Sequence, residues 1–402
     1  MRQIGRAFGM GGIGRMRQRI SVIAALLSAA GVQAQAQTPP RPPELPVEES
    51  DVAALPVLGP RVVMVNTNWG STGARLFDGD TGKMLGLIHE AQLSNVALDP
   101  AGRYFYVAES IWTKGNRGTR QDMLTVRDAR TLKVVREIAL PGRLLVGTRK
   151  HDLGISADGR YAYVYDFDPA SSIIVVDLVR SRVLGRTEVP GCGLSAAIGA
   201  AASLSLCADG ALAVTTLDAR GRGSVSRSES FFSAENDPIF DNFAVDTASG
   251  AAMMLSYTGL VYPVDASGEP KAPTPWSVQE AAGLPRASTA PLAVNWLPGG
   301  RQPMAWHKPS GRLFVLMHMG EYWSQKEPGT ELWVIDSATR RVLTRKKLKH
   351  KASFVEVSQD AQPLLFLNEE ETLWVLDAAT LEQKHEIANA GGGTLTTFGP
   401  VR

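Results

Sequence analysis

Residues 332–348 read Leu-Trp-Val-Ile-Asp-Ser-Ala-Thr-Arg-Arg-Val-Leu-Thr-Arg-Lys-Lys-Leu, an apolar run followed by an Asp-led turn and further apolar residues. This order is typical of a β-hairpin, because Val, Ile and Trp favour strands whereas Asp, Ser and Thr favour turns. Residues 373–381 repeat it as Leu-Trp-Val-Leu-Asp-Ala-Ala-Thr-Leu. The chain is therefore predicted to be built from repeats.

Copies of this Asp-led turn recur at the spacing of a propeller blade. They begin at Asp78, Asp128, Asp177, Asp218, Asp265, Asp336 and Asp377. Five of the six intervals lie between 41 and 50 residues, the length of a four-stranded blade. A second hairpin type, with Gly in its turn, alternates with the first, as in residues 95–107. We predict an all-β fold, a seven-bladed β-propeller of four-stranded antiparallel blades.

The predicted propeller spans residues 61–402. One interval is 71 residues long, so we expect an inserted loop at about 271–301, where Pro, Gly and Ala are frequent. Closure of the ring requires the strand that begins at Arg61 to pair with residues 394–398, which would remove two open sheet edges.

The N-terminus has the order of a secretory signal peptide. Five arginines and no acid occur in residues 1–36, with an apolar run at 20–27 and Ala-Gln-Ala at 34–36. The run is too short to span a bilayer, so we expect cleavage near Ala36, with an uncleaved anchor as the alternative. Residues 37–60 are rich in Pro and are predicted to form an extended arm.

Charge and cysteine content agree with export to the periplasm. Without the five arginines of the leader, 37 basic residues face 40 acidic ones. No basic stripe remains, so we expect no nucleic-acid partner, and no membrane span after removal of the signal. In an oxidising compartment Cys192 and Cys207 would form a disulfide, although two buried free thiols are an alternative.

Few residues are candidates for catalysis. The six histidines lack the spacing of a metal site, and only His307 and His318, which flank one predicted hairpin, could approach each other. We therefore predict no catalytic residue, bound cofactor or metal on this chain. Trp333 and Trp374 occupy equivalent strand positions and should pack between blades, whereas Trp69 and Trp112 follow strand ends and are candidates for partner contact.

Several motifs together resemble the heavy subunit of the methylamine and aromatic amine dehydrogenases. The first is Arg-Gly-Thr-Arg-Gln-Asp at 117–122. Others, in the same order as in that family, are Leu-Pro at 140–141, Val-Gly-Thr at 146–148, the cysteines of 190–192 and 207–210, Glu-Tyr-Trp-Ser-Gln-Lys at 321–326, and residues 357–365. The likeness runs from about Arg61 to the C-terminus.

This resemblance implies a function for which the reactive group lies on another chain. In the family, primary amines are oxidised by tryptophan tryptophylquinone of a small light subunit, and electrons pass to a periplasmic cupredoxin or cytochrome. Two heavy and two light chains are implied. An aromatic side chain after the first propeller strand of relatives reaches toward the quinone, and Trp69 lies in a similar loop.

Two other interpretations of the sequence compete with this one. A stand-alone periplasmic propeller could bind a ligand or a protein, since a fold does not fix a function. A lactonase-like hydrolase would require a cluster of metal-binding side chains in the channel, which the sequence does not suggest.

Overall fold

The computed structural model describes residues 54–67, 73–91, 94–115, 117–144 and 149–399. Residues 1–53 lie outside this description, and so do the predicted signal peptide, most of the predicted arm, and Trp69. All of the blades belong to one compact unit, Val52–Arg402.

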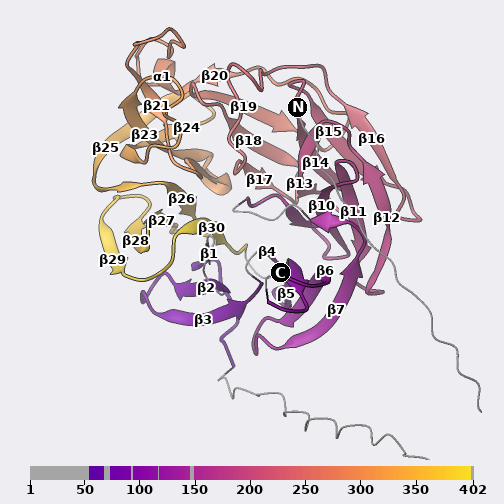
Figure 1. Cartoon of the computed structure of the whole chain (residues 1–402). Helices are drawn as coiled ribbons and strands as arrows, with labels where there is room; N and C mark the ends of the chain where they lie inside the picture. The colour runs from indigo at the N-terminus through magenta and orange to yellow at the C-terminus, as the bar shows by residue number, and fades with distance from the viewer. Residues whose placement is uncertain (1–53, 68–72, 92–93, 116, 145–148, 400–402) are drawn as a thin grey trace, which may run out of the picture. The chain divides into compact units, whose positions relative to one another are not determined.

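Seven antiparallel sheets surround a common axis and confirm the predicted propeller (Figure 1). Blade 1 contains β30 (Gly393–Thr397), β1 (Val62–Thr67), β2 (Gly73–Asp78) and β3 (Met84–His89). Blade 2 contains β4 (Ser94–Leu98), β5 (Tyr104–Trp112), β6 (Arg120–Asp128) and β7 (Val134–Leu140). Blade 4 contains β13 (Cys192–Ile198), β14 (Ala202–Cys207), β15 (Leu212–Leu217) and β16 (Gly223–Arg227).

Blade 5 contains β17 (Ala244–Asp246), β18 (Ala251–Leu255), β19 (Leu260–Asp265) and β20 (Trp276–Ser277). Blade 7 contains β26 (Phe354–Val357), β27 (Leu364–Glu369), β28 (Thr372–Asp377) and β29 (Gln383–Ile387). Blades 3 and 6 each have a divided first strand. Blade 3 contains β8 (Arg143–Leu144), β9 (Leu153–Ile155), β10 (Tyr161–Asp168), β11 (Ser172–Asp177) and β12 (Arg182–Glu188). Blade 6 contains β21 (Asn295–Pro298), β22 (Met304–His307), β23 (Arg312–Gly320), β24 (Gly329–Asp336) and β25 (Arg341–Ala352).

The seven aspartates lead the turns between the third and fourth strands, as predicted. Each carboxylate accepts a hydrogen bond from a backbone N–H of its own turn. At Asp336 the donor is the N–H of Thr339, at 2.7 Å, and this bond lowers the pKa of the Asp336 carboxyl. These aspartates therefore fix turns, and none of the seven needs a catalytic explanation.

The antiparallel topology gives the propeller two different faces. The face that we call the turn face carries the Asp-led turns and the connections from first to second strands. The opposite loop face carries the connections from second to third strands and those between blades. Five of the predicted turns contain Gly, at 99–102, 156–159, 207–210, 246–250 and 308–311. Four of them lie on the turn face, but the turn at 207–210 joins β14 to β15 and lies on the loop face. The expected alternation of hairpin types is wrong there, because the short turn after β13 is at Gly199 instead.

Large side chains between the blades form the core. Trp333 is fully buried and packs with Val261 and Trp276 of the preceding blade. Trp374 packs with Phe314 and Val334, again of the preceding blade. The prediction that these tryptophans fill equivalent inter-blade positions is confirmed.

The inserted segment and the end of the arm contribute ordered structure, and the inserted segment includes the helical turn that the sequence had suggested at 278–282. Residues 271–301 contain β20, the short helix α1 (Val278–Ala281) and β21. Ser277 caps α1, because its hydroxyl accepts hydrogen bonds from the N–H groups of Gln279 and Glu280. At the end of the predicted arm, Leu55 and Leu58 are buried in the cluster that also holds Phe105.

The ring closes as the sequence predicted, by pairing of β1 with β30 from Val63 opposite Thr397 to Thr67 opposite Gly393. The side chain of Gln302, which is buried, fastens the closing strand. Its amide oxygen accepts a bond from the N–H of Leu395 at 2.9 Å, and its amide nitrogen donates to the carbonyls of Leu395 (3.1 Å) and Val355 (2.9 Å). One side chain thus joins the inner strands of blades 1 and 7.

Replacement of Gln302 by Leu should destabilise the ring, because similar volume is kept while three buried backbone groups lose a partner. We expect a loss of about 2–4 kcal/mol in the free energy of unfolding, measured by urea denaturation. The matched control is Gln383→Leu on exposed β29, which should change stability by less than about 0.5 kcal/mol. Equal effects of the two variants would contradict this role for Gln302.

Candidate functional site

The loop face carries an ordered tryptophan at the end of the β5–β6 hairpin. Trp112 lies opposite Arg120, and the Arg120 guanidinium stands 5.4 Å from the centre of the indole ring. The same guanidinium forms a bidentate ion pair with Asp122, at 2.7–3.0 Å, and donates to the hydroxyl of Ser110 at 2.8 Å. Since Asp122 and Ser110 are buried, the half-buried indole is presented on a fixed support.

A larger aromatic group lies on the loop face at blades 5 and 6. Trp323 is 55% exposed and meets Tyr257 edge to face, with ring centres 5.9 Å apart. Tyr322 packs on its other side at 4.8 Å and donates its hydroxyl hydrogen to the carbonyl of Asn236. Trp323 also has a backbone φ of 71°, which is costly for a bulky residue and must be stabilised by its surroundings.

Other exposed apolar side chains gather at the same end of blade 6. Leu292 and Val294 precede β21, and Met319 is near the end of β23, which pairs with β21 through Asn295 and Gly320. Exposed apolar surface of this kind often marks a protein contact. Sequence reasoning did not select Trp323 as a contact residue, although Glu-Tyr-Trp-Ser-Gln-Lys at 321–326 was among the motifs that resemble the family.

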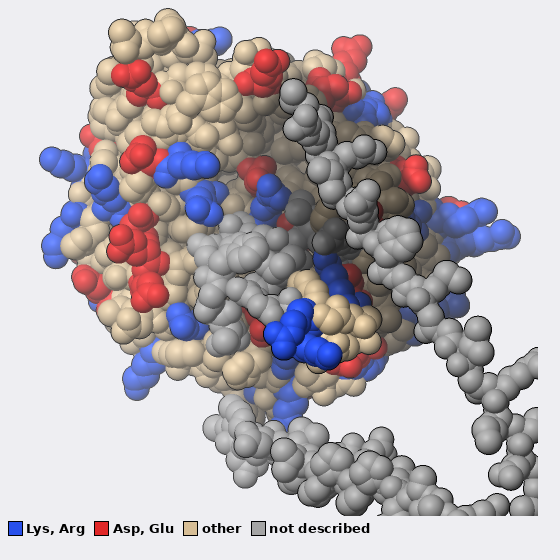
Figure 2. Space-filling view, in the orientation of Figure 1, with Lys and Arg blue, Asp and Glu red and all other residues tan. Residues whose placement is uncertain are grey.

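Charge does not define a binding surface at large scale. On the face shown in Figure 2, Lys and Arg are interspersed with Asp and Glu. On that face, charge alone therefore does not mark a binding surface.

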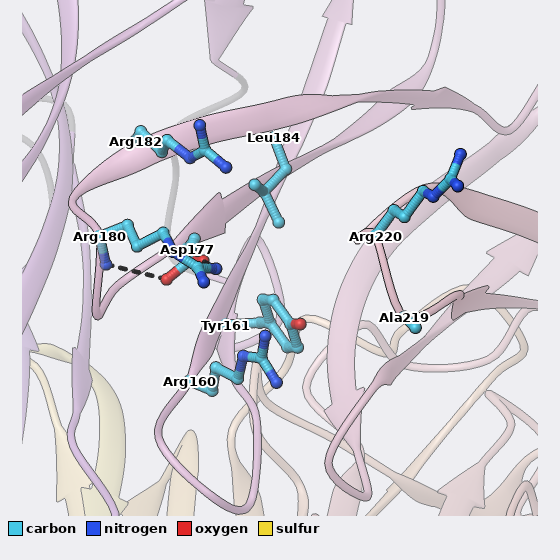
Figure 3. Close-up of a pocket in the computed structure, with 8 residues that line it drawn as sticks. All are labelled: Arg160, Tyr161, Asp177, Arg180, Arg182, Leu184, Ala219 and Arg220. Carbon is cyan, nitrogen blue, oxygen red and sulfur yellow. Dashed lines mark hydrogen bonds and ion pairs between the residues drawn. The ribbon is translucent and has the colours of Figure 1, made fainter.

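Two cavities occur toward the turn face. The central one, of about 430 Å³, receives residues from the innermost strand of every blade. At its loop-face end an ion pair between Lys150 and Glu356 crosses the axis from blade 3 to blade 7. The second cavity, of about 310 Å³, lies between blades 3 and 4 and is lined by four arginines (Figure 3).

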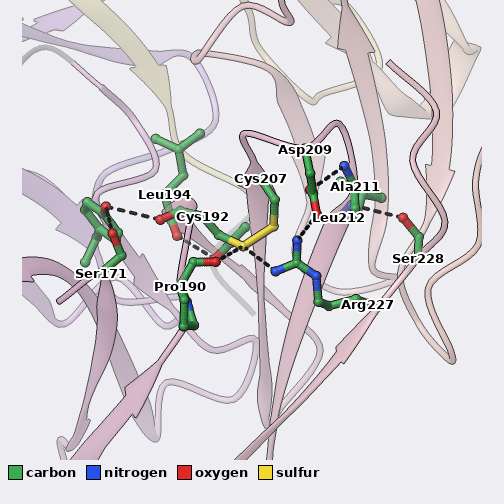
Figure 4. The surroundings of a disulfide bond; sticks show 12 residues. Ser171, Pro190, Cys192, Leu194, Cys207, Asp209, Ala211, Leu212, Arg227 and Ser228 are labelled. Atoms are coloured by element: carbon green, nitrogen blue, oxygen red, sulfur yellow. Dashed lines mark hydrogen bonds and ion pairs between the residues drawn. A yellow bond between two sulfur atoms is a disulfide. The ribbon is translucent and has the colours of Figure 1, made fainter. Parts of the chain in front are cut away.

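The predicted disulfide is present on the loop face, where Cys192 of β13 lies opposite Cys207 of β14 (Figure 4). Arg227 lies beside it, within 3.1 Å of the Cys192 sulfur, and is paired at 2.6 Å with Asp209 in the following turn. Tyr165 of blade 3 donates its hydroxyl hydrogen to the carbonyl of Cys192 at 3.2 Å. The bridge thus ties an innermost strand to its neighbour and to the adjacent blade.

The half-buried Glu90 and the buried Asp152, both near the loop face, have strongly raised pKa values. Burial raises the pKa of Glu90 to about 7, and Glu90 accepts a hydrogen bond from the hydroxyl of Ser94. Burial also raises the pKa of Asp152 to about 7, and neither of its carboxylate oxygens has a hydrogen-bond partner. Groups with shifted pKa values are frequent at functional sites.

The histidines take part in separate contacts. His307 lies within hydrogen-bond distance of Ser310 and the carbonyl of Asp360, whereas His318 contacts Ser324. Burial lowers the pKa of His151 to about 4, so the ring is neutral near pH 7 and donates to the carbonyl of Phe243 at 2.8 Å. In the part of the chain that the structure describes, no group of three His, Cys, Asp or Glu residues could hold a metal ion.

The exposed aromatic and apolar side chains of the loop face favour contact with a protein partner. Trp112 belongs to this surface, while the position of Trp69 lies outside the described residues. Within the described ranges, no helix is long and apolar enough to cross a membrane.

Comparison with known proteins agrees on one family. The family model of the methylamine dehydrogenase heavy chain matches residues 61–398. The methylamine dehydrogenase heavy chain of Methylorubrum extorquens is 29% identical over 325 residues, which cover 79% of this chain and 77% of that protein. That of Methylobacillus flagellatus is 26% identical over 345 residues, covering 85% and 83%.

A solved structure of dihydro-heme d1 dehydrogenase NirN in complex with DHE is also similar. Its TM-score is 0.51 at 17% sequence identity, and the alignment covers 90% of this chain and 83% of that one. At this identity the likeness concerns the fold alone.

Removal of the disulfide by Cys192→Ala together with Cys207→Ala should lower the free energy of unfolding by about 3 kcal/mol, the value for a 15-residue loop. Urea denaturation measures the change. A reducing agent should destabilise the wild-type protein equally and leave the double variant unaffected. A variant as stable as the oxidised wild type would refute the expectation.

The free energy of unfolding should fall with rising pH because of the raised pKa of Asp152. Folding raises the pKa of this acid from 3.8 to about 7, so between these values the folded state binds more protons than the unfolded chain. The stability of the wild type is therefore lost progressively as pH rises through this window. Asp152→Asn removes the charge, and its stability relative to wild type should grow by up to about 3 kcal/mol from pH 5 to pH 8.

Urea denaturation of both proteins at the two pH values measures this difference. Because Glu90 is unchanged in both, its titration cancels. If the difference in free energy of unfolding between the variant and the wild type is the same at pH 5 and pH 8, Asp152 does not titrate in this range.

Proposed function

Since this chain belongs to the methylamine dehydrogenase heavy chain family, we propose that it is the heavy, non-catalytic subunit of a periplasmic amine dehydrogenase. The enzyme would deaminate primary amines oxidatively to aldehyde and ammonia. The observation that carries this proposal is the family match over residues 61–398, which includes all seven blades. Residues 1–36 would direct export, and 37–60 would form an arm before the propeller.

The reactive group would be tryptophan tryptophylquinone on a light subunit, which supplies the electrophilic carbonyl that unmodified side chains lack. The heavy chain would scaffold that subunit and help to shape the substrate entrance. Two heavy and two light chains would form the complex, and a cupredoxin or a cytochrome would accept the electrons.

We assign the light-subunit contact to the loop face. Trp112 is held there by Arg120, and Trp323 projects with more than half of its surface exposed. Large aromatic side chains on a rigid support are the usual anchors of protein interfaces, because they bury much area with little loss of entropy. We propose that Trp69, from the first blade, takes part in the entrance on this same face.

The proposed assembly is tested by purification of the chain from its native periplasm. We expect it to co-purify with a small cysteine-rich protein and with quinone absorbance. Recovery of the chain alone, without quinone absorbance, would contradict the proposal and favour a stand-alone propeller that binds a ligand or protein, for which the central cavity of about 430 Å³ offers space.

The assigned face is tested by substitution. Trp323→Ala should weaken binding of the light subunit at least about ten-fold, as expected for an interface anchor, and Trp112→Ala should weaken it in the same direction. The control is Val179→Ala on the turn face, where Val179 is also exposed. Calorimetric titration of light subunit measures each affinity, and an equal effect of the control would place the contact elsewhere.

A further inference from the structure

The cavity between blades 3 and 4 is unusual because arginines from three different turns line it. Arg160 comes from the connection of β9 to β10, and Arg220 from the β15–β16 turn of the next blade. Arg180 lies in the β11–β12 turn and Arg182 begins β12. Figure 3 shows these side chains around one space, with Leu184 and Tyr161 completing the wall. In Figure 2, basic side chains project from the edge that carries β12 and β16 in Figure 1.

The positive charge of this cavity is not balanced by its own acid. Asp177 is the one carboxylate of the lining, and both of its oxygens are used by Arg180. One accepts the Arg180 backbone N–H at 2.9 Å, and the other accepts from the Arg180 guanidinium at 3.0 Å. Within the described ranges, Arg160, Arg182 and Arg220 have no carboxylate within ion-pair distance.

All four arginines are exposed, and one of the cations packs on a buried aromatic ring. The Arg160 guanidinium lies 4.9 Å from the centre of the Tyr161 ring, and the Tyr161 side chain is itself buried. Arg220 is carried by a turn whose backbone N–H donates to Asp218 at 2.8 Å. The turns therefore fix where the arginine backbones stand around the cavity, so that an anion needs to order only their side chains.

We propose that this cavity, defined by Arg160, Arg180, Arg182 and Arg220, binds a small multivalent oxyanion of the polyphosphate or polycarboxylate class. Guanidinium groups match the paired oxygens of phosphate and carboxylate, and several of them favour a ligand with more than one negative charge. The volume of about 310 Å³ is near the lower limit for small-molecule pockets and favours a compact ligand.

This site lies on the turn face, opposite the surface that we assign to the light subunit. An anion could therefore occupy it in the free chain and in a complex alike. The inference does not depend on the proposed amine dehydrogenase function.

The test is calorimetric titration of the full mature chain, with its light subunit where the two co-purify. Inorganic pyrophosphate is the probe in one arm and citrate in the other, so that the arms distinguish phosphate from carboxylate. We expect saturable one-to-one binding in at least one arm, with an affinity that falls as NaCl is added. The double variant Arg182→Gln/Arg220→Gln should weaken binding at least about ten-fold.

The structure supplies a matched control for these substitutions. Arg341 lies opposite Asp336 in blade 6, just as Arg182 lies opposite Asp177 in blade 3, but Arg341 does not line the cavity. Arg341→Gln should change the affinity less than two-fold. Absence of binding in both arms, or equal weakening by Arg341→Gln and the double variant, would overturn the proposal.

Discussion

The pairing of β1 with β30 is the contact on which the remaining structure depends. Without it, β1 and β30 would each keep an unpaired strand edge and the ring would remain open. Gln302 adds a constraint that backbone pairing alone cannot supply, because its side chain joins the closing strand β30 to β26 of blade 7. The ring is therefore locked at its axis, which explains how loops on either face can be held in fixed positions.

The same topology separates two kinds of surface. Turns on one face are short and polar and are fixed by aspartates that accept backbone N–H groups. Connections on the other face are longer and include Trp112 and Trp323, together with the disulfide. A partner on the loop face and an anion on the turn face would not compete for space. Function in this chain would then depend on what the rigid ring presents, since the reacting group is proposed to lie on another subunit.

Local sequence patterns predicted much of the fold. The Asp-led turns, the inter-blade positions of Trp333 and Trp374, and the closing pair were all visible as residue types at regular spacing. The candidate surfaces were harder, because they depend on distances between blades. Arg180 and Arg220 are 40 residues apart in the sequence, and they line the same cavity only because blades 3 and 4 pack together. The turn at 207–210 joins second and third strands, whereas the other Gly-bearing turns of similar sequence join first and second strands. Trp323 was overlooked because its backbone conformation and exposure are tertiary properties.

Ring closure also affects how the chain reaches its native state. Val63 pairs with Thr397, so a contact near one end of the propeller waits for residues more than 300 positions later in the chain. Most blades can form from local hairpins, but blade 1 has a high contact order and must be completed last. Until then β1 is an unpaired edge that other chains could join. Chaperone protection of the nascent propeller would matter most during this interval, and its folding rate should be governed by blade 1 rather than by the average blade.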